Sequence, residues 1–312
     1  MLVIYLYRLK RTYTYTYTYT YTYTENMPVH TRKNLNNAKS LLEQSQAILV
    51  VTGAGMSVDS GVPTYRGSGG IWTRSIQVGD ECYSYDEISS LKMWKTIPHL
   101  AWGFKASFYH TMNTLEPHEG YSILLNAVQN KGEYFICTSN VDGYFERAGF
   151  DTSRIYEVHG TIQKNQCTDK RCNIRNGVTD AVIPEIDPDT LLAKKLPVCS
   201  FCGNMTRPNV SMFGDYEFFE EPAKHQRKRL NVWLDKVNRE QKQLVIIEIG
   251  CGVNRHSLRM SNGKMMSGEW KMPLLENHLG TIRINPEQNT NDPNTIHINM
   301  GAKAGLRALF SG

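Results

Sequence analysis

The chain has 312 residues, 40% hydrophobic and 21% charged, which is long enough to bury a substantial core as one globular unit with an insertion or as two small domains. No run approaches the roughly 18–20 apolar residues that cross a bilayer, which argues against an integral membrane protein. The net charge is only +5, and the one short basic run, His225–Arg229, is better interpreted as a solvated helix face than as a nucleic-acid site.

The first 27 residues differ from the rest of the chain. Residues 13–24 alternate Thr and Tyr, a low-complexity pattern that carries no catalytic chemistry. The alternation has high strand propensity, but no obvious part of the chain complements it. We therefore expect residues 1–27 to be a disordered or artefactual extension, with Met27 as a credible true start.

A pattern typical of nucleotide-binding α/β folds follows. Apolar spacing predicts a helix over 32–46, and the continuous apolar run at 47–52 predicts a buried strand. Further apolar runs, separated by stretches long enough for crossover helices, predict the other strands of a parallel sheet. These runs lie at 133–140, 243–250, 281–285 and 294–300. The expected fold class is α/β, with a doubly wound, Rossmann-like parallel sheet.

A glycine turn, Gly53-Ala54-Gly55, directly follows the first predicted strand. It supplies the first two glycines of a dinucleotide-binding turn, which permit a tight turn and close approach of the backbone to a pyrophosphate. The third glycine is replaced by Val58, and no second strand ending in Asp or Glu follows about 20 residues later. The pattern therefore indicates a nucleotide site and disfavours an ordinary NAD dehydrogenase.

Asn140 and Asp142 lie at the C-terminal end of the strand predicted over 133–140, the edge at which open α/β sheets bind ligands. Because they are two residues apart in an extended segment, their side chains point the same way and can reach one ligand. On this pattern alone, a strand-end turn is the preferred interpretation, since Asn, Asp and Gly are common in turns.

Four of the seven cysteines form two close pairs, Cys167 with Cys172 and Cys199 with Cys202. Gaps of four and two residues are typical of zinc ligands and predict one tetrahedral, structural zinc ion. Free thiols or a redox pair are the alternative. This cysteine usage suits an intracellular, reducing compartment, among which we favour the cytoplasm over the nucleus and the mitochondrion.

The sequence around the cysteines is polar and broken into short pieces that cannot build a core of their own. We therefore expect a small zinc-binding module over 166–213. It would be inserted into a discontinuous Rossmann-like, nucleotide-binding domain formed by residues 28–165 and 214–312.

Three segments in this order resemble the signature of the sirtuin family of NAD-dependent protein deacylases. They are GAGMSVDSGVPTYRG at 53–67, TSNVDGYFERAG at 138–149 and VHGT at 158–161. A fourth, RPNVSMFGD at 207–215, is similar to the family segment that lines the acyl-lysine channel. Each short match could arise by chance, but their order together with the cysteine pairs identifies the chain as a member of this family.

The resemblance implies that NAD is consumed as a co-substrate and that an acylated protein or peptide is the substrate, giving free lysine, nicotinamide and O-acyl-ADP-ribose. His159 would be the general base, a role that suits an imidazole near neutral pH. Asn140 would orient groups around the nicotinamide ribose, and Asp142 would hold the nicotinamide carboxamide. Further contacts to NAD would come from Gly53, Ala54, Gly55, Pro63, Tyr65, Arg66, Gly250, Cys251, Asn285 and Glu287. The residues expected to contact substrate are Val210, Met212 and Phe213.

Departures from the family pattern keep other functions open. Ser139 stands where the family usually has Gln, and Cys251-Gly252 stands where many relatives have Thr-Ser, which removes side-chain donors to the cofactor. An ADP-ribosyltransferase or NAD hydrolase would cleave the same glycosidic bond with another acceptor. A non-catalytic, NAD-sensing interaction module is the alternative of another class, against which the intact His159 argues. We expect neither membrane insertion nor specific nucleic-acid binding.

Overall fold

The computed structural model describes residues 28–64, 75–252, 259–261, 264–266, 277–287 and 294–311. The extension expected over residues 1–27 lies outside them. The chain divides into two compact units, which we call the sheet unit and the cysteine unit. The sheet unit takes its described residues from 21–62, 117–158 and 223–312, and the cysteine unit from 63–116 and 159–222. No helix in the described part of the chain is both long and apolar enough to span a bilayer.

The sheet unit is built on six parallel strands in the order β13-β12-β9-β1-β4-β5. In chain order they are β1 (Ala47–Thr52), β4 (Tyr134–Thr138), β5 (Ile155–Glu157), β9 (Leu244–Ile249), β12 (His278–Ile284) and β13 (Thr295–Ile298). The chain builds outward from β1 on one side through β4 and β5, and then on the other through β9, β12 and β13. This is a doubly wound order, so the predicted fold class is confirmed.

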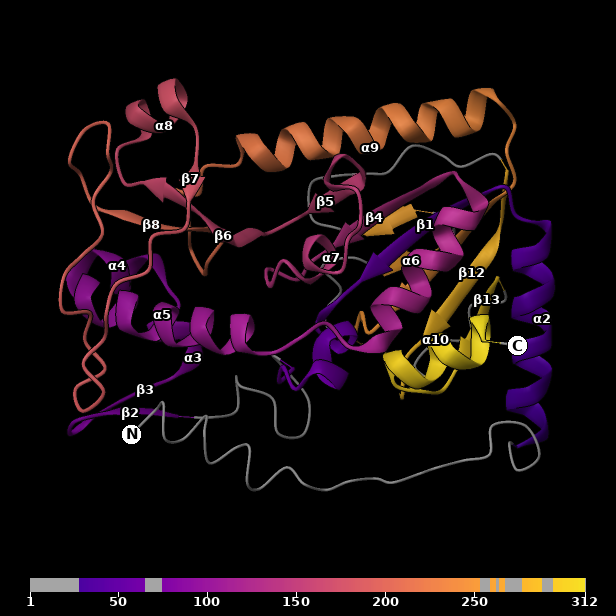
Figure 1. Cartoon of the computed structure of the whole chain (residues 1–312), viewed down its shortest axis with the longest axis horizontal. Helices are drawn as coiled ribbons and strands as arrows, with labels where there is room; N and C mark the ends of the chain where they lie inside the picture. The colour runs from indigo at the N-terminus through magenta and orange to yellow at the C-terminus, as the bar shows by residue number, and fades with distance from the viewer. Residues whose placement is uncertain are drawn as a thin grey trace. The chain divides into compact units, whose positions relative to one another are not determined.

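The core of the sheet unit lies between the central strands and the helices on either side of them. Strands β1, β4 and β9 are buried along their whole lengths, which explains why they are continuous apolar runs in the sequence. Alternate residues of β1 pack against the apolar side of α9 (Glu221–Arg239). In Figure 1, α9 runs along one side of the sheet, and α6 (Glu119–Lys131) and α10 (Ala302–Phe310) run along another.

Shorter elements complete the sheet unit. The helix α2 confirms the helix predicted over 32–46, and the 3-10 helix η1 begins at Ala54, the second residue of the glycine turn. The bounds are α2 (Val29–Gln44), η1 (Ala54–Ser60), α7 (Tyr144–Arg147), η3 (Thr152–Arg154), β10 (Arg259–Ser261) and β11 (Lys264–Met266).

The cysteine unit contains a three-stranded antiparallel sheet in the order β7-β6-β8 and a β2–β3 hairpin. Its strands are β2 (Ile76–Val78), β3 (Glu81–Tyr83), β6 (Gly160–Cys167), β7 (Thr179–Asp180) and β8 (Thr206–Val210). Its helices are α3 (Tyr85–Ile88), α4 (Leu91–Thr96), α5 (Pro98–Thr114) and α8 (Lys170–Asn176).

Helix α5 supplies much of the core of the cysteine unit. The rings of Trp94 and Trp102 meet edge to face at 5.3 Å, and Trp102 Nε1 donates to Thr206 O at 2.8 Å. Gly103 lets α5 approach the 191–193 segment, because a Cβ there would lie 1.7 Å from Leu191 O. The compact unit is therefore larger than the module expected over 166–213, since that segment shares a core with an apolar helix that precedes it by about 60 residues.

Candidate active site

The glycine turn after β1 lies against the end of β9. Gly53 N donates to Ile249 O and Gly55 N donates to Gly250 O, each at 3.1 Å. A Cβ on Gly55 would lie 2.6 Å from Gly250 Cα, and Gly250 itself has φ of +61°. The structure thus brings together three residues predicted for the cofactor site, and it shows that mutual backbone contact requires them to be glycine.

Cys251 follows Gly250 with its side chain directed at the sheet. Its Sγ lies 3.4 Å from Val51 O, and burial raises the pKa of the thiol well above its ordinary value. The thiol therefore remains protonated and bonded to backbone. A contact from Cys251 to NAD, as predicted, would have to come from its backbone.

Four polar side chains meet at the carboxyl end of β4 and are joined through one hydroxyl, that of Ser57 in η1. Asn140 Nδ2 donates to Ser57 Oγ at 3.0 Å, and Ser57 Oγ donates to Asp142 Oδ2 at 2.6 Å. The hydroxyl of Tyr121 in α6 lies 3.1 Å from Ser57 Oγ. All four residues are at most 6% exposed. Asn140 and Asp142 therefore converge on Ser57, which lies inside the motif at 53–67 but was given no role from the sequence, and Tyr121 lies in none of the motifs.

Asp142 is held at both carboxylate oxygens. Oδ2 accepts from Ser57, and Oδ1 accepts from Tyr144 N at 3.0 Å. Burial raises the pKa of Asp142 above its ordinary value, while these two hydrogen bonds act in the opposite direction. The backbone of Asn140 is fixed as well, because its N–H donates to Thr138 Oγ1 at 3.0 Å.

His159 belongs to the cysteine unit and immediately precedes β6. Its carbonyl accepts from Ser211 N at 3.0 Å, and the next residue, Gly160, pairs with Val210 of β8. Burial lowers the pKa of the His159 imidazole below its ordinary value. The side chain is therefore uncharged at neutral pH, the form in which an imidazole accepts a proton.

The segment predicted to contact substrate follows this β6–β8 pairing. Met212 Sδ accepts from Trp94 Nε1 at 2.9 Å, and the ring of Phe213 meets that of Tyr85 edge to face at 6.5 Å. Phe213 remains 39% exposed, whereas Val210 is buried. The pairing of β6 with β8 thus brings predicted substrate residues beside the backbone of the predicted base.

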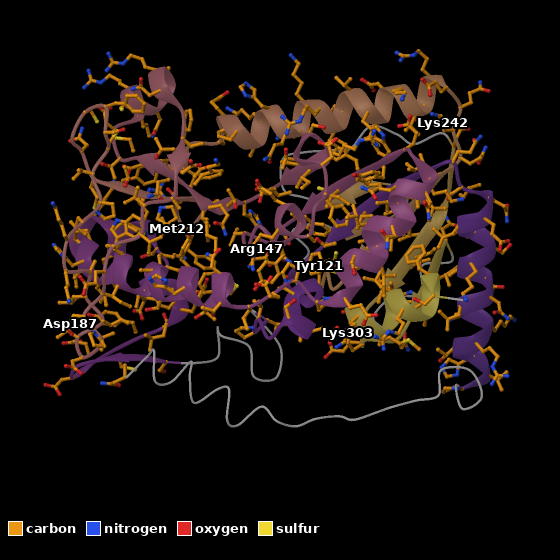
Figure 2. The ribbon with its side chains drawn as sticks, in the orientation of Figure 1. Tyr121, Arg147, Asp187, Met212, Lys242 and Lys303 are labelled. Carbon is orange, nitrogen blue, oxygen red and sulfur yellow. The ribbon has the colours of Figure 1, made fainter. Side chains whose placement is uncertain are left out.

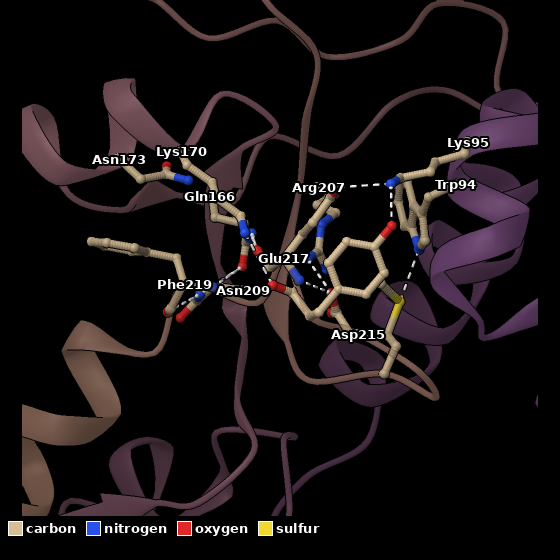
Figure 3. A network of polar contacts seen from close by, with 12 residues as sticks. Trp94, Lys95, Gln166, Lys170, Asn173, Arg207, Asn209, Asp215, Glu217 and Phe219 are labelled. Carbon is tan, nitrogen blue, oxygen red and sulfur yellow. Dashed lines mark hydrogen bonds and ion pairs between the residues drawn. The ribbon is translucent and has the colours of Figure 1, made fainter.

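Buried polar contacts hold the substrate segment on both sides (Figure 3). Before it, Arg207 Nη2 forms an ion pair with Asp215 Oδ1 at 2.9 Å, and both side chains are at most 1% exposed. Asn209 Nδ2 donates to Gln166 Oε1 at 3.0 Å and to Phe219 O at 2.9 Å. Residues 210–213 therefore lie between anchored neighbours.

The four predicted metal ligands come together in the cysteine unit. The Sγ atoms of Cys167, Cys172, Cys199 and Cys202 all lie within 4.8 Å of one another. The Cys167–Cys202 and Cys172–Cys199 distances are 3.5 and 3.6 Å, close to the roughly 3.8 Å edge of a tetrahedron with Zn–S bonds of 2.3 Å. Four thiolates leave no open coordination position, so this donor set fits a structural zinc ion.

The remaining predicted cofactor residues are dispersed. Pro63 is described, whereas Tyr65 and Arg66 lie outside the described residues. Asn285 follows β12, donates its N–H to Ile298 O at 3.1 Å and donates Nδ2 to Glu287 O at 2.9 Å. The Asn285 carboxamide thus bridges a turn at the same carboxyl edge of the sheet that carries Asn140.

Comparison with known proteins decides the family. The Sir2 family model matches residues 53–233, more than half of the chain. The chain belongs to the Sir2 family. This confirms the sirtuin resemblance predicted from the motifs.

Among curated relatives, the "NAD-dependent protein deacetylase" of Bacillus subtilis (strain 168) is 35% identical over 186 residues, 57% of this chain and 67% of that protein. The "NAD-dependent protein deacylase 2" of Pseudomonas aeruginosa is 30% identical over 172 residues, 55% of this chain and 62% of that protein. The matches to this Sir2-family chain thus span about two thirds of these relatives' length.

Solved structures confirm the Sir2 fold. A Sir2 homologue in complex with NAD has a TM-score of 0.61 and 23% identity, covering 88% of this chain and 92% of that one. A Sir2 complex with deacetylated p53 peptide and 3′-O-acetyl ADP ribose has a TM-score of 0.57 and 19% identity, covering 89% and 97%.

Proposed function

We propose that this Sir2-family chain is an NAD-dependent protein-lysine deacylase that releases nicotinamide and O-acyl-ADP-ribose. The observation that carries the proposal is the junction of Asn140, Ser57 and Asp142 at the carboxyl edge of the sheet, where open α/β folds bind nucleotides. The names of the curated relatives support this activity over ADP-ribosyl transfer, NAD hydrolysis or a non-catalytic role.

The polar groups at this edge fit the nicotinamide end of NAD. Within the described residues, the Asn140 side chain makes one hydrogen bond, to Ser57, which leaves its Oδ1 and a second N–H for a ligand. Asp142 offers a carboxylate that is already oriented by Ser57 and Tyr144. A carboxamide needs one acceptor for its NH₂ and one donor for its oxygen, and these side chains provide both.

Each proposed role follows from one property of the residue. NAD supplies a glycosidic bond whose cleavage makes the ribose carbon electrophilic. Asp142 accepts from the carboxamide and so holds the leaving group in place, while Asn140 orients the ribose. His159 takes a proton from a ribose hydroxyl, since burial keeps its imidazole uncharged near pH 7.

The proposed substrate is an acylated protein or peptide bound along residues 210–213. Strand β8 pairs only with β6 in the described three-stranded sheet, so it is an edge strand, and residues 210–213 begin with its last residue, Val210. An extended peptide can add to such an edge through backbone hydrogen bonds, which suits many protein sequences. Exposed Phe213 then offers an apolar contact for the acyl-lysine chain.

One assay separates this proposal from its alternatives. Purified chain is incubated with NAD, with and without an acetyl-lysine peptide, and nicotinamide, peptide mass and ADP-ribose products are followed by mass spectrometry. We expect nicotinamide release that depends on the peptide, with loss of the acetyl group and formation of O-acetyl-ADP-ribose. Release without peptide would establish an NAD hydrolase, an ADP-ribosylated peptide would establish a transferase, and no release would leave NAD binding alone.

A further inference from the structure

Tyr121 is a buried tyrosine that no sequence motif marks. It lies near the start of α6, is 1% exposed and is labelled in Figure 2. Its ring packs edge to face with Tyr144 and Phe145, at 6.0 and 5.1 Å, and lies 5.0 Å from His118. A buried phenol needs a hydrogen-bond partner, and here the partner is Ser57.

The direction of each hydrogen bond follows from the chemistry of the partners. Ser57 has one proton, which it donates to the Asp142 carboxylate over 2.6 Å. Asn140 Nδ2 can only donate, so it uses one lone pair of Ser57 Oγ. The phenol must therefore donate to the second lone pair, and Tyr121, Ser57 and Asp142 form a directed chain.

His118 fixes the other side of this junction. Its Nδ1 accepts from Gly120 N at 2.9 Å, so Nε2 carries the proton and donates to Met56 O at 2.8 Å. This links the start of α6 to the residue before Ser57. The backbone of Ser57 and the ring of Tyr121 are thus held in one place, and the phenol hydroxyl sets only the direction of the Ser57 hydroxyl.

We propose that Tyr121 is a positioning residue for the nicotinamide end of NAD, acting through Ser57 on Asp142 and Asn140. This inference rests on the proposed function, because it assigns NAD to those two residues. By occupying the second lone pair, the phenol leaves Ser57 a single arrangement, in which its proton points at Asp142. Without the phenol, the Ser57 hydroxyl can rotate, and the Asp142 carboxylate loses its fixed donor.

The test compares Tyr121→Phe with Tyr134→Phe. Both variants remove one hydroxyl from a buried ring, but Tyr134 belongs to β4 and its hydroxyl bonds to no residue of the Ser57 junction. For Tyr121→Phe we expect KM for NAD and the inhibition constant of nicotinamide to rise roughly three- to tenfold, the effect of one hydrogen bond. KM for the acyl-peptide and the acid limb of the pH profile, which reports His159, stay unchanged.

A double-mutant cycle with Ser57→Ala completes the test. Because Tyr121 acts through Ser57, Tyr121→Phe should have no further effect on NAD binding once Ser57 is Ala. Equal effects of Tyr121→Phe and Tyr134→Phe, or an unchanged effect of Tyr121→Phe in the Ser57→Ala background, would overturn the inference. If the wild-type chain releases no nicotinamide, the proposed function is wrong, but the inference can still be tested. Calorimetric titration then compares the dissociation constants of NAD for the same variants.

Discussion

The backbones of Gly55 and Gly250 touch, so that a Cβ on Gly250 would lie 2.4 Å from Gly55 Cα. This contact closes the turn after β1 onto the end of β9, although about 200 residues separate the two glycines in the sequence. A short GAG motif is therefore only half of the structural feature, and the other half is a glycine at the end of a different strand.

Gly250→Ala should destabilise the chain by more than a positive φ alone explains. A left-handed backbone costs an L-residue about 1–2 kcal/mol, and the steric contact with Gly55 adds to this. Gly132→Ala is the matched control, because Gly132 has φ of +79° and no atom within 4 Å of an added Cβ. Urea unfolding should show a clearly larger loss for Gly250→Ala, together with weaker NAD binding. Equal losses would mean that the turn can move apart.

The burial of Lys105 predicts that the free energy of unfolding depends on pH. The side chain is buried in α5 with its Nζ 3.0 Å from Ser89 Oγ, and burial, with a smaller effect from Arg207, lowers its pKa from 10.5 to about 8. Below pH 8 the Lys105 side chain is protonated in both the folded and the unfolded chain. The full cost of burying its charge then lowers the free energy of unfolding. As the pH rises from 8 to 10.5, the unfolded chain binds more protons, so stability rises and the cost disappears.

Lys105→Met should therefore stabilise the chain at pH 7 by up to about 3 kcal/mol, with the gain vanishing near pH 10.5. Exposed Lys92→Met, elsewhere in the same unit, should change little at any pH. Urea unfolding of both variants at several pH values between 7 and 10.5 gives the comparison. A gain for Lys105→Met that does not depend on pH would indicate better packing alone.

His159→Ala should abolish deacylation and leave NAD binding intact, since it removes the proposed base and none of the groups around Ser57. In the wild-type chain, activity should fall with acid as the imidazole is protonated. Because burial lowers the pKa of His159, the midpoint of that limb should lie below 6.5. The exposed His110→Ala is a control that should retain the same profile. Peptide turnover across pH 5–8 and NAD titration test both points, and retained activity in His159→Ala would remove the residue from the mechanism.

The cysteine cluster predicts one zinc ion per chain and folding of the surrounding segment that depends on it. Cys199→Ser should lower the zinc content and open α8 and residues 198–206 to hydrogen exchange. Cys82→Ser, at an exposed cysteine outside the cluster, should change neither. Elemental analysis of protein purified without chelator settles the stoichiometry, and metal-free protein with unchanged exchange would contradict the zinc site.

Local sequence patterns predicted most of the sheet and several of the residues that converge on it. The strand expected at 47–52 is β1 with the same bounds, and the apolar runs at 133–140 and 243–250 contain β4 and β9. These patterns are strong because a strand buried on both faces must be apolar throughout. The four cysteines, which the structure brings together, were predicted from their spacing alone, whereas Asn140 and Asp142 were assigned to the site through the family resemblance.

Residues that become partners only through long-range packing could not be predicted from local sequence patterns. Tyr121 and Ser57 lie 64 positions apart and become partners only when α6 packs beside η1. The inclusion of residues 63–116 in the cysteine unit was not predicted for the same reason. The close contact of Gly103 with Leu191 joins segments that are far apart in the sequence. Tyr65 and Arg66, predicted from the motif, lie outside the described residues, and their roles stay predictions.

The buried contacts on either side of residues 210–213 have a consequence for how a peptide is recognised. Arg207 with Asp215, and Asn209 with Gln166, fix the residues on either side of this segment in the structure without a bound peptide. Residues 210–213 therefore lose little conformational entropy when a peptide binds. Most of the entropy that is lost on binding comes from the peptide. Under the proposed function, an acylated lysine in a flexible segment, which can adapt to these fixed residues, would therefore be bound in preference to the same lysine in a rigid helix.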